Sequence, residues 1–408
     1  MNSLDEKRHK IQNLLANDGN MNIRVDSSLM KRIQDEVMPV SFHPQIVTSF
    51  NGTFIEASNS TKNWSYFIRD AKKFKKRVVS SLKSPNLSNE VTVHRESEPK
   101  MDRTDCIPMY SWQEEFHPNC NSFHEVELMF SDYNISLLGN GGWRDAWRIN
   151  PGFEVILKTL RWRENFDKTT FDRHQIDAIV ADRVSPSPYT ISIYGFCGES
   201  TFNELGHSSL LDQLEMNRTS SELLRLAFGI AQGVADLNYL NDIKNATIAH
   251  NDIKPANIIF VGDTPKLNDF NDCQLLWWNK RTQSQCLYKR PETIPWVRYR
   301  APEQTSSRNS LTYAVDSYGL GNVLFHLLTG KKPYFELKAM SRARELTKDG
   351  ISPRLPDFYR QSKDPAISLL VSVIDELHQA NPRMRKTTIS AAAKLRKVIE
   401  QTTFAPSI

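Results

Sequence analysis

The sequence contains few cysteines and no long apolar run. Its five cysteines are scattered and odd in number, which argues against a disulfide framework and favours a reducing compartment. No stretch approaches the roughly 20 apolar residues that a membrane-spanning helix needs, and the charged start MNSLDEKRHK does not resemble a signal peptide. We therefore expect no membrane span and a cytoplasmic protein. A lumenal or membrane-tethered protein is the alternative if the N-terminus is truncated.

A large excess of charge of one sign is also missing. Fifty-two Lys and Arg residues against 47 Asp and Glu residues give a net charge of +5 over 408 residues. A chain so weakly charged gives no reason to expect nucleic-acid binding across its surface. With 39% hydrophobic and 24% charged residues, the composition is that of a globular protein with a sizeable core.

The first quarter of the chain differs from the rest. Residues 1–105 are polar and rich in Ser, Asn and Lys, which is typical of a partly disordered extension. Its basic run, Lys72–Arg77, could dock on an acidic partner, on anionic lipid or on an import receptor, but a solvated helix face is the favoured interpretation. Residues 106–131 are predicted to be a lead-in that packs on the strand-rich start of a domain covering residues 132–402.

Within this domain, strand-like segments give way to helix-like segments. Val155–Leu160 and Thr190–Gly198 concentrate β-branched and aromatic residues in short runs, which predicts strands. Apolar residues at helical spacing predict helices over Ser220–Leu240, Val315–Gly330 and Ala366–Leu377. The order predicts an α+β fold with a strand-rich part followed by a helix-rich part.

A polar cluster interrupts the apolar stretch IAHNDIKPANIIF, Ile248–Phe260. It contains His250, Asp252, Lys254 and Asn257. Buried polar groups are costly without partners, so such a cluster is either a satisfied structural network or a reaction site. Asp269 follows twelve residues after Asn257. Two acids and an amide near neighbouring strand ends offer the hard oxygen ligands that Mg²⁺ prefers, together with substrate phosphates.

Two upstream features also suit phosphate binding. The segment LGNGGWRDAW places Gly139, Gly141 and Gly142 where backbone amides can approach a polyphosphate. Lys158 then supplies a cation near the end of the strand-like run VILKTL. Each feature alone is a weak signal, but together they indicate a phosphate-handling site.

In this order, the motifs resemble the eukaryotic protein kinase domain over roughly Leu137–Ile399. They are the glycine loop from Leu138, VILK ending at Lys158, HNDIKPAN from His250, DFN at Asp269, APE at Ala301, the apolar helix with Asp316, and NPRMRK from Asn381. The resemblance implies a bilobal protein-kinase-like fold, with a small sheet-rich N-lobe containing one main helix and a larger helical C-lobe. Nucleotide would lie between the lobes. The DIKPAN form resembles the serine/threonine class.

The resemblance also implies ATP and Mg²⁺ as cofactors and a protein as substrate. Asp252 would accept the proton of the substrate hydroxyl, Lys254 would steady the γ-phosphate, and Asn257 and Asp269 would hold the metal. The implied nucleotide-binding residues are Gly139, Asn140, Gly141, Gly142, Ala146, Lys158, Asp177, Glu204 and Gly206. Asp177 would pair with Lys158, with Asp182 as the alternative partner.

Some implied roles are architectural or concern the adenine site. Glu303 and Arg385 would form a buried ion pair, and Asp316 would brace the catalytic loop. Glu204 and Gly206 would read adenine through their backbones, while Asn203 would guard the pocket behind it.

The sequence departs from the family pattern at three positions. Asn251 replaces the usual arginine before Asp252, which argues against control by phosphorylation of the activation segment. Asn271 replaces the glycine of DFG, and asparagine tolerates a left-handed backbone there. Arg144 replaces the third glycine of the loop and would either touch phosphate or narrow the cleft.

No departure removes the proton acceptor, the metal ligands or Lys158, so the sequence favours an active protein kinase. The alternatives are a pseudokinase scaffold that binds nucleotide or partner proteins, and a kinase-like enzyme that phosphorylates a sugar or other small molecule. In the activation segment, Trp277 and Trp278 would form a docking patch if exposed, or clamp the segment if buried.

Overall fold

The computed structural model describes residues 105–114, 135–150, 154–161, 163–164, 167–290 and 295–403 of the chain. The predicted extension, apart from residue 105, lies outside the described residues, and so does the basic run Lys72–Arg77. Most of the predicted lead-in is outside them as well.

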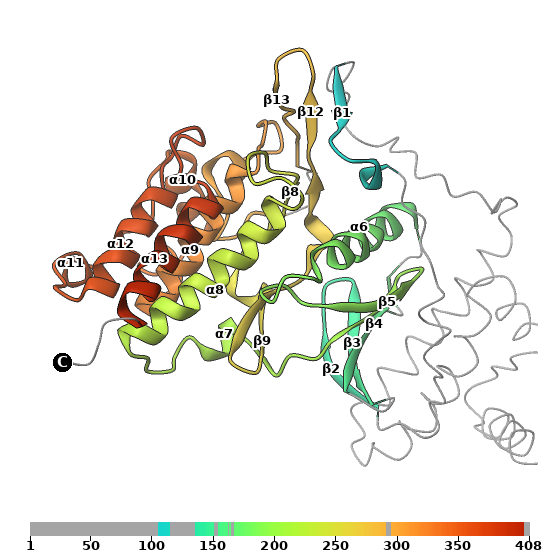
Figure 1. Ribbon diagram of the computed structural model, residues 1–408, viewed down its shortest axis with the longest axis horizontal. Coiled ribbons are helices and arrows are strands. Elements are labelled where there is room, and N and C mark those ends of the chain that lie inside the picture. The colour runs from blue at the N-terminus through green and yellow to red at the C-terminus, as the bar shows by residue number, and fades with distance from the viewer. Residues whose placement is uncertain are drawn as a thin grey trace, which may run out of the picture.

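The small lobe is a five-stranded antiparallel sheet with one long helix beside it (Figure 1). Its strand order is β2-β3-β4-β6-β5. The strands are β2 (Ser136–Asn140), β3 (Arg144–Ile149), β4 (Val155–Leu160), β5 (Ile193–Cys197) and β6 (Ser200–Glu204). Helix α6 (Lys168–Val184) begins where the side chain of Asp167 accepts a hydrogen bond from the backbone N–H of Thr170.

The large lobe is helical and is built around a central buried helix. Its helices are α7 (Leu210–Gln213), α8 (Ser220–Asn238), α9 (Ala314–Thr329), α10 (Met340–Lys348), α11 (Asp357–Arg360), α12 (Pro365–Leu377) and α13 (Thr388–Thr403). Every residue of α9 except Thr329 is buried, which explains why its sequence is apolar on all sides. Together, the two lobes confirm the predicted bilobal α+β fold.

Short elements carry the polar motifs at the junction of the lobes. The strands are β7 (Ser208–Ser209), β8 (Ile248–Ala249), β9 (Ile258–Val261), β10 (Thr264–Leu267) and β11 (Gln274–Leu275). Three single-turn helices begin within the motifs HNDIKPAN, DFN and APE. They are η3 (Pro255–Asn257), η4 (Phe270–Asp272) and η5 (Pro302–Thr305). Strand β8 pairs with β11, and β9 pairs with both β7 and β10, so the loops between them are held at fixed positions.

A third sheet joins the lead-in to the activation segment. It pairs β1 (Cys106–Pro108) with β12 (Trp277–Asn279), and β12 with β13 (Ser284–Gln285). Figure 1 shows this sheet above the junction of the lobes. The described part of the lead-in therefore pairs with the activation segment. It reaches the small lobe where Arg183 of α6 lies over the ring of Trp112, in the single turn η2 (Ser111–Gln113).

A disulfide reinforces this sheet and corrects the expectation of reduced cysteines. Cys106 and Cys286 are bonded across 180 residues of sequence, and Cys197 is disulfide-bonded as well. Cys273 is the free cysteine of the described part of the chain. The sequence prediction failed because a spacing of this length carries no signal for pairing.

Within the described ranges, no helix has both the length and the apolar character required to cross a bilayer.

Candidate active site

The catalytic loop is fixed to the buried helix α9 through its backbone. Asp316 accepts hydrogen bonds from the backbone N–H groups of His250 (2.6 Å) and Asn251 (2.8 Å), and from the side chain of Asn238 (2.7 Å). Asn251 adopts a left-handed backbone with φ of 68°, a conformation that asparagine tolerates. The predicted bracing role of Asp316 is confirmed.

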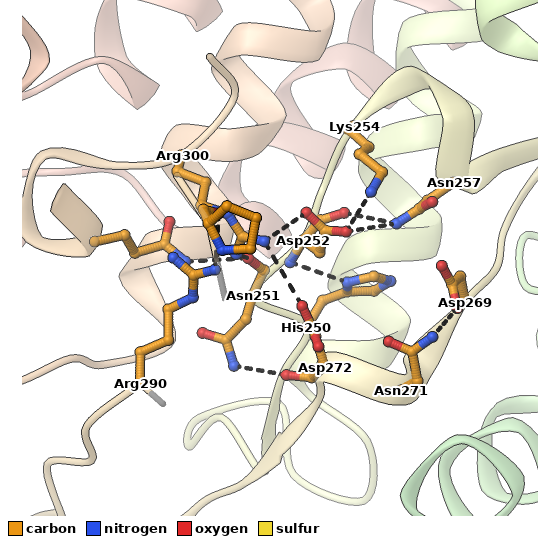
Figure 2. Close-up of polar contacts among 12 residues, drawn as sticks. His250, Asn251, Asp252, Lys254, Asn257, Asp269, Asn271, Asp272, Arg290 and Arg300 are labelled. Atoms are coloured by element: carbon orange, nitrogen blue, oxygen red, sulfur yellow. Dashed lines mark hydrogen bonds and ion pairs between the residues drawn. The ribbon is translucent and has the colours of Figure 1, made fainter. Parts of the chain in front are cut away.

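Asp252 lies at the centre of a charged cluster (Figure 2). Its carboxylate accepts from Lys254 Nζ at 2.5 Å and Asn257 Nδ2 at 3.3 Å, and it is ion-paired with Arg300 Nη2 at 3.1 Å. Burial by itself would raise the pKa of Asp252, but the charges of Arg300 and Lys254 outweigh burial and lower that pKa. The carboxylate is therefore ionised and can accept a proton.

The two predicted metal ligands follow this loop. Asn257 donates its Nδ2 to the backbone oxygen of Asp252 at 2.9 Å, so its amide oxygen is the atom suited to a cation. The backbone N–H of Asn268 bonds the backbone oxygen of Asn257 at 2.9 Å, which brings Asp269 to the same side of the loop (Figure 2). Burial and the charge of Asp177 raise the pKa of Asp269.

The backbone at DFN differs from the expectation. The left-handed residue is Asp269, with φ of 67°, whereas Asn271 lies within η4. The side chain of Asn271 instead donates a hydrogen bond to Asp269 Oδ1 (Figure 2). The asparagine of DFN thus orients the carboxylate that was predicted to bind metal.

The predicted ion pair between Lys158 and Asp177 is not formed. Lys158 Nζ donates to the side-chain oxygen of Asn268 at 3.1 Å, and Asp177 pairs with Arg144. The aspartate side chain is one methylene shorter than the glutamate usual in the family, and Arg144 supplies a closer cation. Asp182, the alternative partner, is exposed on the far side of α6.

Lys158 and Asp177 nevertheless lie close enough for their charges to interact. Burial lowers the pKa of Lys158, while the charge of Asp177 opposes that change. Burial would raise the pKa of Asp177, but Arg144 and Lys158 together bring it well below its usual range. Asp177 Oδ1 also accepts the backbone N–H of Phe270 at 2.8 Å, so α6 is tied directly to DFN.

The glycine loop is the turn between β2 and β3. The backbone N–H of Gly141 bonds the backbone oxygen of Arg144 at 2.8 Å, and a Cβ on Gly141 would lie 2.9 Å from that oxygen. Among described atoms, none lies within 4 Å of a Cβ added to Gly139 or Gly142. Asn140 donates to Asp145 at 2.7 Å. The loop is thus a tight turn with open backbone on either side of Gly141.

The strand register places the remaining cleft residues on one face of the sheet. Ala146 is directly opposite Lys158, and Lys158 is opposite Thr201. Residues directly opposite in an antiparallel pair share a face, so these side chains lie together. Asn203, two residues after Thr201, is on this face too and is buried. Its position is consistent with the predicted pocket-guarding role.

The hinge follows at the end of β6. The side chain of Glu204 is held by Lys266 at 2.8 Å and 3.0 Å, and its backbone N–H bonds the backbone oxygen of Ser192 at 3.0 Å. A Cβ on Gly206 would lie 2.0 Å from Ile259 Cγ2, so only glycine fits between the hinge and β9. The backbone N–H of His207 bonds Phe260 O at 3.0 Å and fixes the hinge to the large lobe.

Arg300, the residue before APE, also belongs to the site, although the sequence did not predict it. Besides Asp252, it contacts the backbone oxygen of Asn251 at 2.6 Å and Asp272 at 3.6 Å (Figure 2). It therefore supplies a cation beside the loop position where Asn251 lacks one. The one signal in the sequence was the position of Arg300 directly before the APE motif, since arginine is otherwise mostly exposed.

The activation segment is held at both ends. Trp277 and Trp278 are half-buried within β12, so they help to clamp the segment to β1. Glu303 and Arg385 form the predicted ion pair at 2.7 Å, with the Arg385 side chain fully buried. Thr293, a possible phosphorylation site, lies outside the described residues.

The donor set fits a nucleotide with Mg²⁺. The described residues contain no cluster of three or more His, Cys, Asp or Glu side chains suited to a metal. A site made of one carboxylate, Asp269, and one carboxamide, Asn257, suits a cation that takes its remaining ligands from phosphates and water. Lys158 and the open glycine loop supply the complementary groups for those phosphates.

Comparison with known proteins agrees with this geometry. The protein kinase domain family matches residues 139–396, which is more than half of the chain. The chain belongs to the protein kinase family. Kinase domains of this family generally use ATP and Mg²⁺ and act on protein substrates.

Relatives of this kinase domain occur in plants. It is 30% identical over 221 residues to the U-box domain-containing protein 70 of Oryza sativa subsp. japonica, covering 52% of this chain and 27% of that protein. It is 27% identical over 257 residues to the receptor-like kinase LIP2 of Arabidopsis thaliana, covering 57% and 42% of the two chains. It is 28% identical over 221 residues to the probable serine/threonine-protein kinase PBL28 of Arabidopsis thaliana, covering 51% and 56%. This chain therefore spans between about a quarter and just over half of the length of these three relatives.

Proposed function

We propose that this chain transfers the γ-phosphoryl group of ATP to Ser or Thr hydroxyls of protein substrates. The observation that carries the proposal is the ionised Asp252 carboxylate, held by Lys254 and Asn257 on the side of the loop where Asp269 lies. The serine/threonine assignment is supported by the DIKPAN sequence and by relatives such as PBL28.

In this mechanism, Asp252 orients the substrate hydroxyl and takes its proton, and Lys254 places its ammonium beside the transferred phosphoryl group. Lys158 holds the phosphate tail from the small lobe, while Asn257 and Asp269 hold Mg²⁺. If bound there by Asn257 and Asp269, Mg²⁺ would supply positive charge to offset the charge that develops on the phosphates during transfer. Positioning and electrostatics supply most of the acceleration, which explains why so many residues here are fixed by hydrogen bonds.

The Cys106–Cys286 disulfide bears on location. Disulfides persist mainly in oxidising compartments, so this bond supports the lumenal alternative over the cytoplasmic one. The basic run Lys72–Arg77 remains a proposed docking site for an acidic partner.

The test is ATP-dependent labelling of a generic protein substrate by the full chain, with Asp252→Asn as the diagnostic variant. We expect the substitution to lower kcat by about a thousandfold, because general-base catalysis contributes roughly 10²–10⁴. The exposed residue Asp263 offers a matched control, Asp263→Asn, with unchanged turnover. ATP binding measured by thermal shift accompanies both.

The outcomes separate the three readings of the sequence. Turnover by Asp252→Asn equal to that of the unmodified chain would remove Asp252 from its role. Absence of any ATP-induced thermal shift would favour a scaffold that binds partner proteins. A thermal shift without protein labelling would favour a small-molecule acceptor or a scaffold that binds nucleotide.

A further inference from the structure

Arg144 is a buried arginine on the nucleotide face of the small lobe. In the register of β3 and β4, Arg144 is opposite Leu160 and Ala146 is opposite Lys158. Alternate residues of a strand share a face, so the side chains of Arg144, Ala146 and Lys158 lie on the same side of the sheet. Only 7% of Arg144 is exposed, although arginine is rarely buried without partners.

One terminal nitrogen of the Arg144 guanidinium has a partner in the structure. Its Nη2 pairs with Asp177 of α6, whose other oxygen accepts the backbone N–H of Phe270. The remaining terminal nitrogen, Nη1, has no hydrogen-bond partner among the described residues, although it is buried. Buried side-chain donors without partners are rare in folded proteins, and each one calls for an explanation.

The surroundings indicate what the missing partner is. Lys158 lies on the same face of the sheet as Arg144, and Asp177, the partner of Arg144, accepts the backbone N–H of Phe270 next to Asp269, so these groups surround one site. Arginine presents several N–H donors in a rigid fork that matches phosphate oxygens. A second cation beside Lys158, with a free donor and open glycine backbone nearby, is complementary to a polyanion.

We propose that Arg144 binds the phosphate tail of the nucleotide through Nη1 while its Nη2 holds Asp177. The inference rests on the proposed function, because the nucleotide is its ligand. Arg144 then links phosphate occupancy to α6, and through Asp177 and Phe270 to the backbone next to Asp269. This role of Arg144 also explains why Lys158 does not pair with Asp177. Arg144 pairs with Asp177 instead, and both Arg144 and Lys158 then face the phosphates.

A purely structural role for Arg144 makes a different prediction. The hairpin has a second connection to α6, since Arg173 lies over the ring of Trp143 at 4.9 Å and pairs with Asp272 at 2.8 Å. Loss of Arg144 therefore leaves the hairpin attached. If Arg144 served only to neutralise Asp177, a variant with both charges removed would bind nucleotide normally.

The experiment measures the affinities of ATP, ADP and adenosine for the full chain by calorimetry. We expect Arg144→Gln to weaken ATP and ADP binding by about tenfold to a hundredfold, as the loss of a charge-assisted contact implies, and to leave adenosine binding unchanged. Arg148→Gln is the matched control, because Arg148 is on the same strand but exposed and paired with Glu154. It should bind all three ligands normally.

The double variant Arg144→Gln with Asp177→Asn removes the uncompensated buried carboxylate and so protects the fold. We expect its ATP affinity to remain as low as that of Arg144→Gln. Recovery of ATP affinity in the double variant, or equal weakening of adenosine and ATP, would overturn the inference. Failure of the unmodified chain to bind ATP would instead refute the proposed function.

Discussion

The two lobes hold their polar residues in different ways. In the large lobe, buried charges bind backbone atoms: Asp316 accepts from two N–H groups of the catalytic loop, and Arg385 donates to the backbone oxygens of Ala314, Gln379 and Ala380. In the small lobe, buried titratable side chains pair mainly with other side chains, as in the ion pair of Arg144 with Asp177 and the contact of His174 with Glu199.

This difference determines how freely partners can be exchanged. A side chain that satisfies backbone groups must match a fixed geometry, so substitution leaves buried donors or acceptors unpaired. A pair of side chains can be replaced by another pair if charge and length still match. The large lobe keeps the bracing aspartate Asp316 and the pair of Glu303 with Arg385, whereas Asp177 of the small lobe has a different partner from the predicted one.

The largest effect is expected at Arg385 in the large lobe. Arg385→Met leaves the partly buried Glu303 without its cation and removes donors from three backbone oxygens. We expect the free energy of unfolding to fall by about 3 to 5 kcal/mol, measured by urea denaturation. The control is Arg360→Met, because Arg360 and Asp375 form an exposed pair at 2.8 Å, and exposed pairs contribute less than about 1 kcal/mol.

Equal losses for Arg385→Met and Arg360→Met would contradict the contrast between the lobes. A further variant, Arg385→Met with Glu303→Gln, removes the lone carboxylate. It should recover part of the stability but not all of it, since the backbone oxygens of Ala314, Gln379 and Ala380 remain unpaired.

The difference between contacts to backbone atoms and contacts between side chains also explains which features the sequence could predict. Val155–Leu160 was predicted as a strand with its observed bounds, and the apolar helix around Asp316 was located to within one residue at each end. The ion pair of Glu303 with Arg385 was also predicted, because both motifs have fixed places in the fold. The error at Asp177 arose because pairing between side chains depends on their length and on a third residue, Arg144.

Two other features could not be derived from the sequence. The disulfide depends on β1 reaching β12 across a long stretch of chain, and no local pattern specifies that approach. The left-handed residue of DFN is Asp269 and not Asn271, and because aspartate and asparagine both tolerate that backbone conformation, the sequence could not decide between them.

Whereas the contacts of the two lobes compared above are non-covalent, the activation segment is held by a covalent crosslink, the Cys106–Cys286 disulfide. Joint replacement, Cys106→Ala with Cys286→Ala, removes a crosslink between residues 180 apart. We expect the free energy of unfolding to fall by roughly 2 to 4 kcal/mol, because the crosslink restricts the unfolded chain. Substitution is preferable to a reductant here, since Cys197 is disulfide-bonded as well.

Each single replacement serves as the control for the pair. Either one breaks the same bond, so Cys106→Ala and Cys286→Ala should each cause about the same loss as the double variant. Losses that add up would mean that the two sulfurs stabilise the fold separately and that the crosslink contributes little.

The smallest effect concerns pH and the small lobe. His174 of α6 and Glu199, between β5 and β6, are both buried and lie 3.1 Å apart. Burial lowers the pKa of His174 to about 3 and raises the pKa of Glu199 to about 8. Between pH of about 3 and about 8, the folded pair therefore keeps one proton, on Glu199. In the unfolded chain, both His174 and Glu199 are deprotonated above a pH of about 6.5.

Because the folded state binds more protons, stability should fall as pH rises from about 6.5 to about 8, by on the order of 1 kcal/mol. Glu199→Gln keeps a neutral partner for His174 and should abolish this slope in urea denaturation. Glu222→Gln is the control, because hydrogen bonds from Thr219 lower the pKa of Glu222 and its titration lies in the acid range. If the pH dependence of stability persists in Glu199→Gln, the proton responsible is bound by another group. The His174–Glu199 pair would then not be what makes the small lobe sensitive to pH.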